Sequence, residues 1–230
     1  MKNNINLSNL SHTWIFDLDG TLLDTIEDLG DSVNEVLAAR EYPTHSYEEY
    51  CFFIGDGMEN LIKRSLPNEC LTDEGLIEEV LIDYREAYTR NWNKKSRPYE
   101  GIMECLDSLR SRNIVSAVLS NKPHHFTEMC VAELIGNQHF DIVLGQREGV
   151  RKKPSPDAAF EICNTIEVDP KDVVFVGDTN VDIVTGIAAG MKTIGVLWGF
   201  REESELREAG AHYIVDKPNQ ILEIIGNGFS

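Results

Sequence analysis

Short, continuously apolar segments alternate with amphipathic segments along most of the chain. The apolar runs occupy residues 13–16, 114–119, 140–144, 173–176, 193–197 and 212–215. Apolar positions three or four residues apart predict helices at 101–112, 123–134, 156–165, 181–189 and 220–225. Strands that are apolar throughout and alternate with helices indicate a parallel sheet that is covered on both faces. The pattern therefore predicts an α/β fold with a Rossmann-like parallel sheet.

A different pattern follows the first apolar run. From Gly20 to about Trp92 the spacing is helical, and no convincing strand is visible. One helix is expected after Asp24 or Thr25 as N-cap, and others near Ser46, over 58–66 and from Thr72. We therefore expect an all-helical insert directly after the first strand. The predicted division is an α/β core of residues 1–22 and 95–230 and a helical cap of residues 23–94.

Composition and charge exclude several classes of partner. The 230 residues include 21 Lys and Arg against 39 Asp and Glu, a formal net charge of −18. Such a surface repels nucleic acid and anionic membranes, so neither is expected as a partner. A phosphorylated ligand would need local positive charge from a metal ion or a few lysines. No apolar run is long enough for a membrane span, and the five scattered cysteines predict reduced thiols in a cytoplasm.

Residues suited to catalysis follow three of the predicted strands. Asp17, Asp19, Gly20 and Thr21 follow the first, Ser120 and Asn121 follow the second, and Asp178 follows the strand at 173–176. Lys153, which precedes Pro-Ser-Pro, lies in a loop before a helix. Ligands of open parallel sheets bind beyond the carboxyl ends of the strands. We therefore expect these motifs to meet at one edge of the sheet.

The two carboxylates of Asp17 and Asp19 point into one small space, because residues i and i+2 of an extended chain face the same way. Their repulsion requires a cation, or a proton on one of them. Asp17 and Asp178 would supply the oxygen ligands that Mg²⁺ prefers, and Asp182 is expected to cap a helix or approach the metal. The alternative interpretation is an Asp-rich turn with capping roles.

Phosphate oxygens need donors as well as a metal ion. The Ser120 hydroxyl, Asn121 and the turn Gly20-Thr21 are expected to contact the substrate phosphate. Lys153 would bring positive charge into an acidic protein, on a loop that its prolines stiffen. Each motif alone is also compatible with an ordinary loop.

Taken together, and in this order, the motifs resemble those of the haloacid dehalogenase superfamily. The resemblance implies that Asp17 is the nucleophile and Asp19 the acid/base, while Ser120 binds phosphate and Lys153 steadies the nucleophile and the phosphoryl group. It also implies that Mg²⁺ is held by Asp17, the main-chain carbonyl of Asp19, and Asp178. The helical insert is similar to the superfamily's small cap, which closes over the site.

The insert and the loops are most similar to those of the phosphoglycolate phosphatase group. The marks are Gly55-Asp56-Gly57, Ser120-Asn121-Lys122-Pro123 and Lys152-Lys153-Pro154. The implied function is Mg²⁺-dependent hydrolysis of a small phosphorylated metabolite, with 2-phosphoglycolate as the best candidate. Pyrophosphatases and sugar-phosphate phosphatases share most of these marks and stay open as alternatives.

Three further alternatives use other chemistry or none. A phosphomutase would use the same core, although familiar sugar mutases have Val where this chain has Thr21. A dehalogenase would leave the carboxylates of Asp19 and Asp178 unexplained. A non-catalytic binding module has no need for all the motifs. The pattern gives no prediction of oligomeric state.

Two basic pairs have competing interpretations. His124 and His125 adjoin a helix start and cannot both face one metal, so surface or capping roles are favoured. Lys63 and Arg64 favour a solvated helix face, but they could instead bind a substrate carboxylate. On the second interpretation the cap would select a small carboxylated phosphate.

Overall fold

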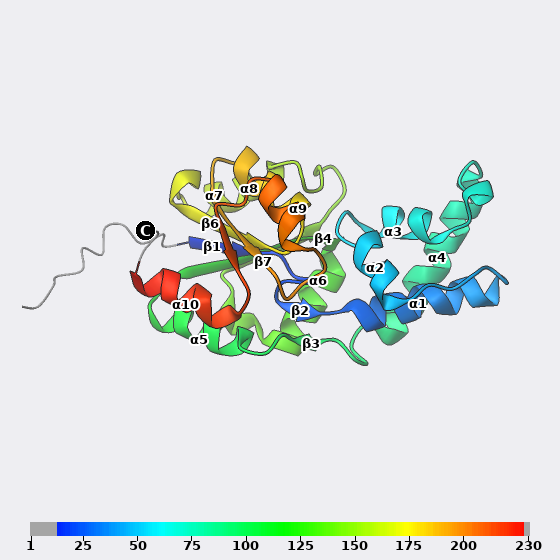
Figure 1. Cartoon of the computed structure of the whole chain (residues 1–230), viewed down its shortest axis with the longest axis horizontal. Coiled ribbons are helices and arrows are strands. Elements are labelled where there is room, and N and C mark those ends of the chain that lie inside the picture. The colour runs from blue at the N-terminus through cyan, green and yellow to red at the C-terminus, as the bar shows by residue number, and fades with distance from the viewer. Residues whose placement is uncertain (1–12, 228–230) are drawn as a thin grey trace, which may run out of the picture.

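The computed structural model describes residues 13–227, and its centre is a six-stranded parallel sheet (Figure 1). The strand order is β5-β4-β1-β6-β7-β8, with every neighbouring pair parallel. The central strand β1 pairs with β4 on one side and β6 on the other. The strands are β1 (Thr13–Phe16), β4 (Val115–Pro123), β5 (Ile142–Gln146), β6 (Val173–Gly177), β7 (Lys192–Val196) and β8 (Tyr213–Val215).

Helices cover both faces of this sheet, so the predicted α/β fold is confirmed. Alternate residues of a strand face opposite sides, and here both sides are buried. Ile15 and Phe175 pack in one apolar cluster with residues of α7, while Trp14 and Phe16 pack in another. The helices of this part are α5 (Ile102–Ser111), α6 (His124–Cys130), α7 (Asp157–Thr165), α8 (Asn180–Ala188), α9 (Glu203–Glu208) and α10 (Pro218–Asn227). A π-helical turn (Val131–Ile135) extends α6, and short 3-10 turns lie at Asn137–His139 and Pro170–Asp172.

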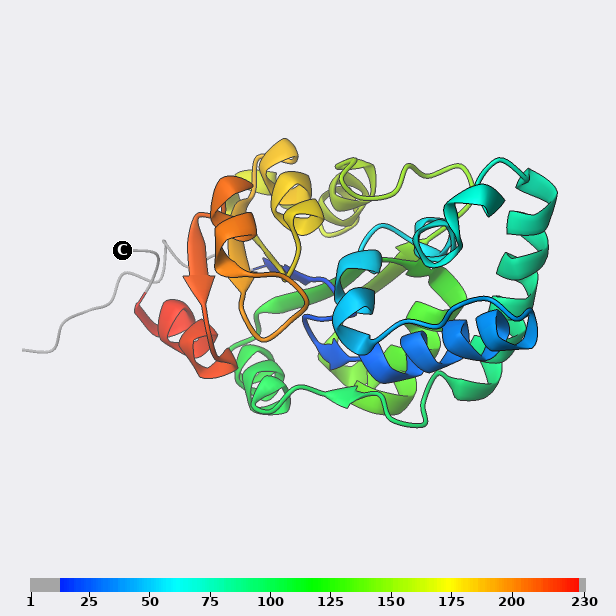
Figure 2. The same cartoon turned by 45° about the vertical axis from the view of Figure 1, so that its right-hand side comes forward.

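The helical insert lies beyond the carboxyl end of the sheet (Figures 1 and 2). It consists of α1 (Ile26–Ala39), α2 (Tyr47–Phe53), α3 (Met58–Ser65), a 3-10 turn (Asn68–Cys70) and α4 (Glu74–Asn91). Helices α1 and α4 pack against each other around buried apolar residues. A Ser46–Glu49 capping box opens α2 as the pattern predicts, whereas α4 begins after Asp73 rather than at Thr72. The predicted limits of core and cap stay a prediction.

Two strands and one α-helix were missing from the sequence interpretation. Strands β2 (Leu23–Asp24) and β3 (Arg97–Pro98) form an antiparallel pair where the chain enters and leaves the insert. The expectation of no strand from Gly20 to Trp92 is therefore wrong at β2. Two-residue strands carry no periodicity, and this pair exists only because two distant crossings meet. Helix α9 is short and charged, and Leu206 is its one buried residue.

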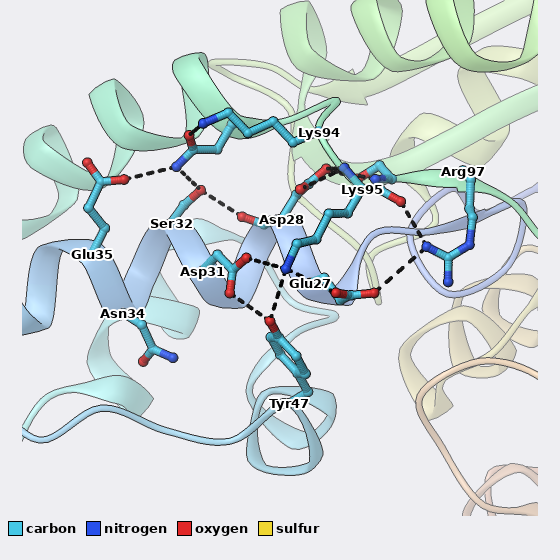
Figure 3. A network of polar contacts seen from close by, with 12 residues as sticks. Glu27, Asp28, Asp31, Ser32, Asn34, Glu35, Tyr47, Lys94, Lys95 and Arg97 are labelled. Carbon is cyan, nitrogen blue, oxygen red and sulfur yellow. Dashed lines mark hydrogen bonds and ion pairs between the residues drawn. The ribbon is translucent and has the colours of Figure 1, made fainter.

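The two crossings are also joined by a polar network around Asp28, in the first turn of α1 (Figure 3). The buried Asp28 carboxylate accepts hydrogen bonds from the backbone N–H groups of Lys95 and Ser96 and from the Ser96 hydroxyl. The Lys95 ammonium in turn contacts Glu27 and Asp31. The start of α1 and the returning chain are therefore held together as one unit.

Two further sequence expectations concern the whole chain. Over residues 13–227, no helix is both long and apolar enough to cross a membrane. All five cysteines are free thiols, four of them buried, as the scattered spacing predicts. A cytoplasmic location stays a prediction.

Candidate active site

Asp17 lies at the carboxyl end of the central strand, where all of the predicted motifs meet. Its backbone N–H donates to the carbonyl of Val176 at 2.9 Å, which continues the pairing of β1 with β6. Its carboxylate is buried, and Oδ1 lies 2.8 Å from Nζ of Lys153. Because β4 and β6 flank β1, Ser120 and Asp178 arrive from its two sides. The sheet order thus brings distant motifs to one edge.

Lys153 is a buried ammonium that bridges two carboxylates. Nζ lies 2.8 Å from Asp17 Oδ1 and 2.6 Å from Asp182 Oδ1, and it donates to the Leu119 carbonyl at 3.0 Å. Burial alone would lower the pKa of Lys153, but the charges of Asp17 and Asp182 outweigh it and raise the pKa. Lys153 therefore stays charged and supplies the local positive charge that an anionic ligand requires.

Asn121 holds the backbone of Lys153 in place. Its Oδ1 accepts from the Lys153 N–H at 2.8 Å, and its Nδ2 donates to the Lys153 carbonyl at 3.1 Å. The same Nδ2 donates to the carbonyl of Gly55 in the insert at 3.1 Å. The amide predicted to contact phosphate therefore joins the strand end, the lysine loop and the insert.

Three buried carboxylates form a cluster beside this lysine. One oxygen each of Asp17, Asp178 and Asp182 lies within 4.8 Å of the others. Burial and the charge of Asp182 raise the pKa of Asp17 to about 7, although Lys153 opposes the rise. Burial and the charges of Asp182 and Asp17 likewise raise the pKa of Asp178. Because three carboxylates face one ammonium, a second cation is favoured here, and an all-oxygen donor set suits Mg²⁺.

Asp182 caps a helix and also lies in the carboxylate cluster. Its Oδ2 accepts from the N–H of Thr179 at 3.0 Å and from the Thr179 hydroxyl at 2.8 Å, at the start of α8. Its Oδ1 contacts Lys153 and belongs to the carboxylate cluster. The sequence signal for this position of Asp182 was its spacing of four residues from Asp178, at the start of a predicted helix.

Gly20 allows the chain to approach Asp178 closely. Its φ is +85°, and a Cβ at this position would lie 2.3 Å from Asp178 Oδ2. The next residue, Thr21, donates its hydroxyl to Asp178 Oδ1 at 2.9 Å. Gly20 and Thr21 thus fix the carboxylate of Asp178.

The loop after β7 was missed by the sequence interpretation. The N–H of Phe200 donates to Asp178 Oδ2 at 2.9 Å, and the indole N–H of Trp198 donates to the carbonyl of Thr21 at 2.9 Å. The available signal was position, since these residues follow a strand at the same sheet edge. The loop completes the hydrogen bonding of Asp178.

The side chain of Asp19 lies apart from the carboxylate cluster. Oδ1 accepts from the hydroxyl of Thr25 at 2.8 Å, and both oxygens accept from Nζ of Lys122, at 2.8 and 3.0 Å. The Lys122 ammonium is buried and lies 4.8 Å from the ring centre of Tyr88, in the insert. Burial would lower the pKa of Lys122, but the charge of Asp19 raises it, so a second ammonium stays charged at the site.

A small pocket separates the sheet edge from the insert, with a cavity of about 40 Å³. Its floor is polar and its roof, contributed by the insert, is mainly apolar. The floor residues are Asp17, Asp19, Ser120, Asn121, Lys122 and Pro123. The roof residues are Leu29, Ile54, Gly55, Gly57, Met58, Leu61 and Tyr84.

The roof is joined to the core through main-chain carbonyls at the end of α2 and in the turn that follows it. Arg201 donates to the carbonyl of Ile54 at 2.9 Å and also to that of Cys51. Nζ of Lys152 donates to the carbonyl of Asp56 at 2.6 Å. Together with the Asn121–Gly55 hydrogen bond, these contacts hold the insert closed over the pocket.

The two ambiguous basic pairs lie outside this arrangement. Lys63 pairs with Glu59 at 2.5 Å, and Arg64 pairs with Asp56 at 2.6 Å, both at exposed positions away from the pocket lining. The favoured interpretation of a solvated face is confirmed, and a contact of this pair with a substrate is not supported. His124 accepts a hydrogen bond from the N–H of Gly145 at the start of α6, outside the carboxylate cluster.

Comparison with known proteins agrees with this geometry. The family model described as haloacid dehalogenase-like hydrolase matches residues 14–196. The phosphoglycolate phosphatase of Haemophilus influenzae is 32% identical over 91% of this chain and 96% of its own length. That of Nitrosospira multiformis is also 32% identical, over 92% and 94%.

Solved structures share the whole fold. A crystal structure from Haemophilus somnus, described as a predicted phosphoglycolate phosphatase, has a TM-score of 0.88 and 26% identity, and the alignment covers 95% of this chain and 99% of that one. The matched region includes every motif of the site, from Asp17 to Asp182. The chain therefore belongs to the haloacid dehalogenase-like hydrolases and is one of the phosphatases of that family.

Proposed function

We propose that this protein hydrolyses a small phosphomonoester, with 2-phosphoglycolate as the best candidate, through a phosphoryl group carried on Asp17. The observation that carries the proposal is the position of the Asp17 carboxylate. It lies at the floor of the pocket, in contact with a buried ammonium and beside two further buried carboxylates. The relatives named phosphoglycolate phosphatase support the choice of substrate.

The reaction proceeds in two steps. Asp17 attacks phosphorus, the bond from phosphorus to the leaving oxygen breaks, and Asp19 gives that oxygen a proton. Water then attacks the aspartyl phosphate, Asp19 takes its proton, and inorganic phosphate and free Asp17 result. Asp19 suits this role because its side chain lies in the pocket lining, apart from the carboxylate cluster.

Charge neutralisation supplies much of the acceleration in phosphoryl transfer. Lys153 is held beside Asp17 and would neutralise a phosphate oxygen as it approaches. The Ser120 hydroxyl, which lines the pocket, would hold another oxygen. Gly20 and Thr21, expected from the sequence to contact the phosphate, act through Asp178 instead, because their backbone N–H groups already donate to the carbonyls of Leu23 and Leu18. Asn121 contributes mainly through the backbone of Lys153, since its amide is already hydrogen-bonded there.

The residues present fit a magnesium ion. Asp17 and Asp178 would supply carboxylate oxygens and Asp19 its main-chain carbonyl, while Asp182 stands next to them. When bound, the ion would offset the charge of the carboxylates and of the phosphate oxygens. The buried, unbalanced carboxylate charge is the observation that supports this assignment.

A hydrolysis screen over many phosphoesters tests the proposal, with Mg²⁺ and with EDTA. We expect phosphate release that requires the metal and is fastest with 2-phosphoglycolate. Release that is faster with a sugar phosphate or with pyrophosphate would redirect the substrate assignment. Release from none of the esters would contradict phosphatase activity.

A further inference from the structure

We propose that Lys122 and Tyr84 form a recognition site for a carboxylate on the leaving group, and so restrict this enzyme to acidic phosphomonoesters. The inference deepens the proposed function and rests on it. The less favoured interpretation of the sequence gave this role to Lys63 and Arg64, which the structure shows to be paired outside the pocket.

Lys122 is the one cationic side chain among the described residues that line the pocket. Lys153 does not line it, and its contacts are with Asp17, Asp182 and a main-chain carbonyl. Of the residues that line the pocket under the apolar roof, Lys122 is therefore the one that would offer an anionic leaving group positive charge. A buried ammonium binds a carboxylate strongly because water competes poorly there.

Tyr84 adds a hydrogen-bond donor that has no partner among residues 13–227. Its side chain is fully buried in α4 and lines the pocket, yet its hydroxyl makes no hydrogen bond to any described residue. A buried polar group of this kind calls for a partner, and a ligand in the pocket would provide one. Burial raises the pKa of Tyr84 well above its ordinary value, so the hydroxyl keeps its proton and can donate.

The position of Lys122 matches the geometry of a 2-phospho acid. Asp19 protonates the leaving oxygen in the proposed reaction, and the Lys122 ammonium lies 2.8 Å from the Asp19 carboxylate. In 2-phosphoglycolate the carboxylate is joined to that oxygen through a single carbon. An ammonium beside Asp19 is therefore beside the substrate carboxylate as well.

The Lys122 ammonium can also donate a hydrogen bond to a substrate while it contacts Asp19. An ammonium carries three N–H donors, and Asp19 is its hydrogen-bond acceptor among the residues that the structure describes. A substrate carboxylate could bind the ammonium and the Tyr84 hydroxyl while Asp19 keeps one contact. A neutral leaving group would offer the Tyr84 hydroxyl at most an uncharged acceptor and would bring no charge for Lys122 to pair with.

The test compares kcat/KM for 2-phosphoglycolate with that for 2-hydroxyethyl phosphate, a neutral analogue, in the full-length protein with Mg²⁺. We expect the wild type to prefer the acid strongly. Tyr84→Phe should reduce this preference about 10-fold, the value of a hydrogen bond to a charged group. Lys122→Met should reduce it by about 30-fold or more, because a buried anion loses its partner, and Lys122→Arg should restore part of it.

Two matched controls come from the same insert. Tyr50 is also buried there, but its hydroxyl donates to Asn34, outside the pocket. Lys63 is a cation of the insert that faces solvent. Tyr50→Phe and Lys63→Met should leave the preference for the acid unchanged.

Equal losses with both esters in Tyr84→Phe and Lys122→Met would overturn the inference, while phosphate release by the wild type would preserve the proposed function. Release from neither ester by the wild type would overturn both. If Lys122→Met does not fold, product inhibition of the wild-type enzyme serves as the test in place of that variant. Glycolate should then compete with substrate far better than ethylene glycol, and equal inhibition by the two would overturn the inference.

Discussion

The ammonium of Lys153 lies 2.8 Å from the carboxylate of Asp17, and both groups are buried. This contact joins the end of the first strand to a loop that is far away in the sequence. It also makes the proposed nucleophile dependent on a neighbouring cation for its charge. Removing either partner would leave uncompensated charge inside the protein.

Replacing Lys153 by Met should therefore affect both activity and stability. We expect phosphate release to fall about 100- to 1,000-fold, the loss seen when a key charge-stabilising group is removed. The free energy of unfolding should fall by about 3–5 kcal/mol, because buried carboxylates lose their partner. Steady-state kinetics and urea denaturation measure the two effects. Lys171→Met, at an exposed lysine that pairs with Asp169, is the control, and equal effects of the two variants would contradict the assignment.

Replacing Asp178 by Asn should weaken metal binding more than substrate binding. One of the proposed carboxylate ligands is lost, so the Mg²⁺ concentration for half-maximal activity should rise about 10-fold or more. Titration of the rate against Mg²⁺ measures the change. Asp172→Asn should leave the titration unchanged, because Asp172 is an exposed carboxylate just before β6, the strand that Asp178 follows. An unaltered half-saturation in Asp178→Asn would move the metal site elsewhere.

The raised pKa of Asp17 gives a pH dependence with a definite sign. Burial first, and then the charge of Asp182, raise the pKa of Asp17 from 3.8 to about 7. Protonation of Asp17 therefore stabilises the folded protein when no metal ion is bound. The stability that this group contributes is full below pH 3.8 and is lost as the pH rises towards 7. A bound cation competes with that proton, so the stabilisation by Mg²⁺ should grow over the same interval.

Thermal unfolding with EDTA and with Mg²⁺ checks this expectation. The difference in Tm between the two conditions should be larger at pH 8 than at pH 5.5, values chosen to lie on either side of about 7. Asp178→Asn should reduce the difference at the higher pH. The same difference at both values would show that the buried carboxylates do not hold the ion.

Asp28 should be important for stability although it lies outside the pocket lining. Its carboxylate accepts from three donors of the returning chain, at Lys95 and Ser96 (Figure 3). Asp28→Ala would leave buried donors unpaired, and we expect a loss of about 2–4 kcal/mol in urea denaturation. Asp31→Ala removes a more exposed carboxylate of the same network and should cost far less. A loss as small for Asp28 as for Asp31 would argue against the structural role of Asp28.

The sequence predicted the parts of the site that depend on one strand and the residues just after it. Thr13 to Phe16 is apolar and buried as expected, and Asp17 follows it at the sheet edge. Motifs at other strand ends came together because parallel strands share an edge. The fold class follows for the same reason, since apolar strands alternate with amphipathic helices.

Contacts between distant side chains could not be predicted in this way. Lys122 reaches Asp19 across 103 positions, and no periodicity encodes which way its ammonium turns. The hydroxyl of Thr25 stands at the N-cap position of α1 but donates to Asp19 instead of to its own helix. The pairing of Arg64 with Asp56 likewise depends on the bend between α2 and α3.

The most direct test of the account is the fate of the phosphoryl group on Asp17. Wild type and Asp17→Asn are mixed with 2-phosphoglycolate and Mg²⁺ and quenched in acid within one turnover. The proteins are then digested, and the masses of their peptides are measured by mass spectrometry. We expect one phosphoryl group on the wild-type peptide that contains Asp17, none on the variant, and a phosphate release rate in the variant below a tenth of the wild type. A phosphoryl group on another residue, or a purified Asp17→Asn variant that keeps a tenth or more of the rate, would contradict the nucleophilic role of Asp17.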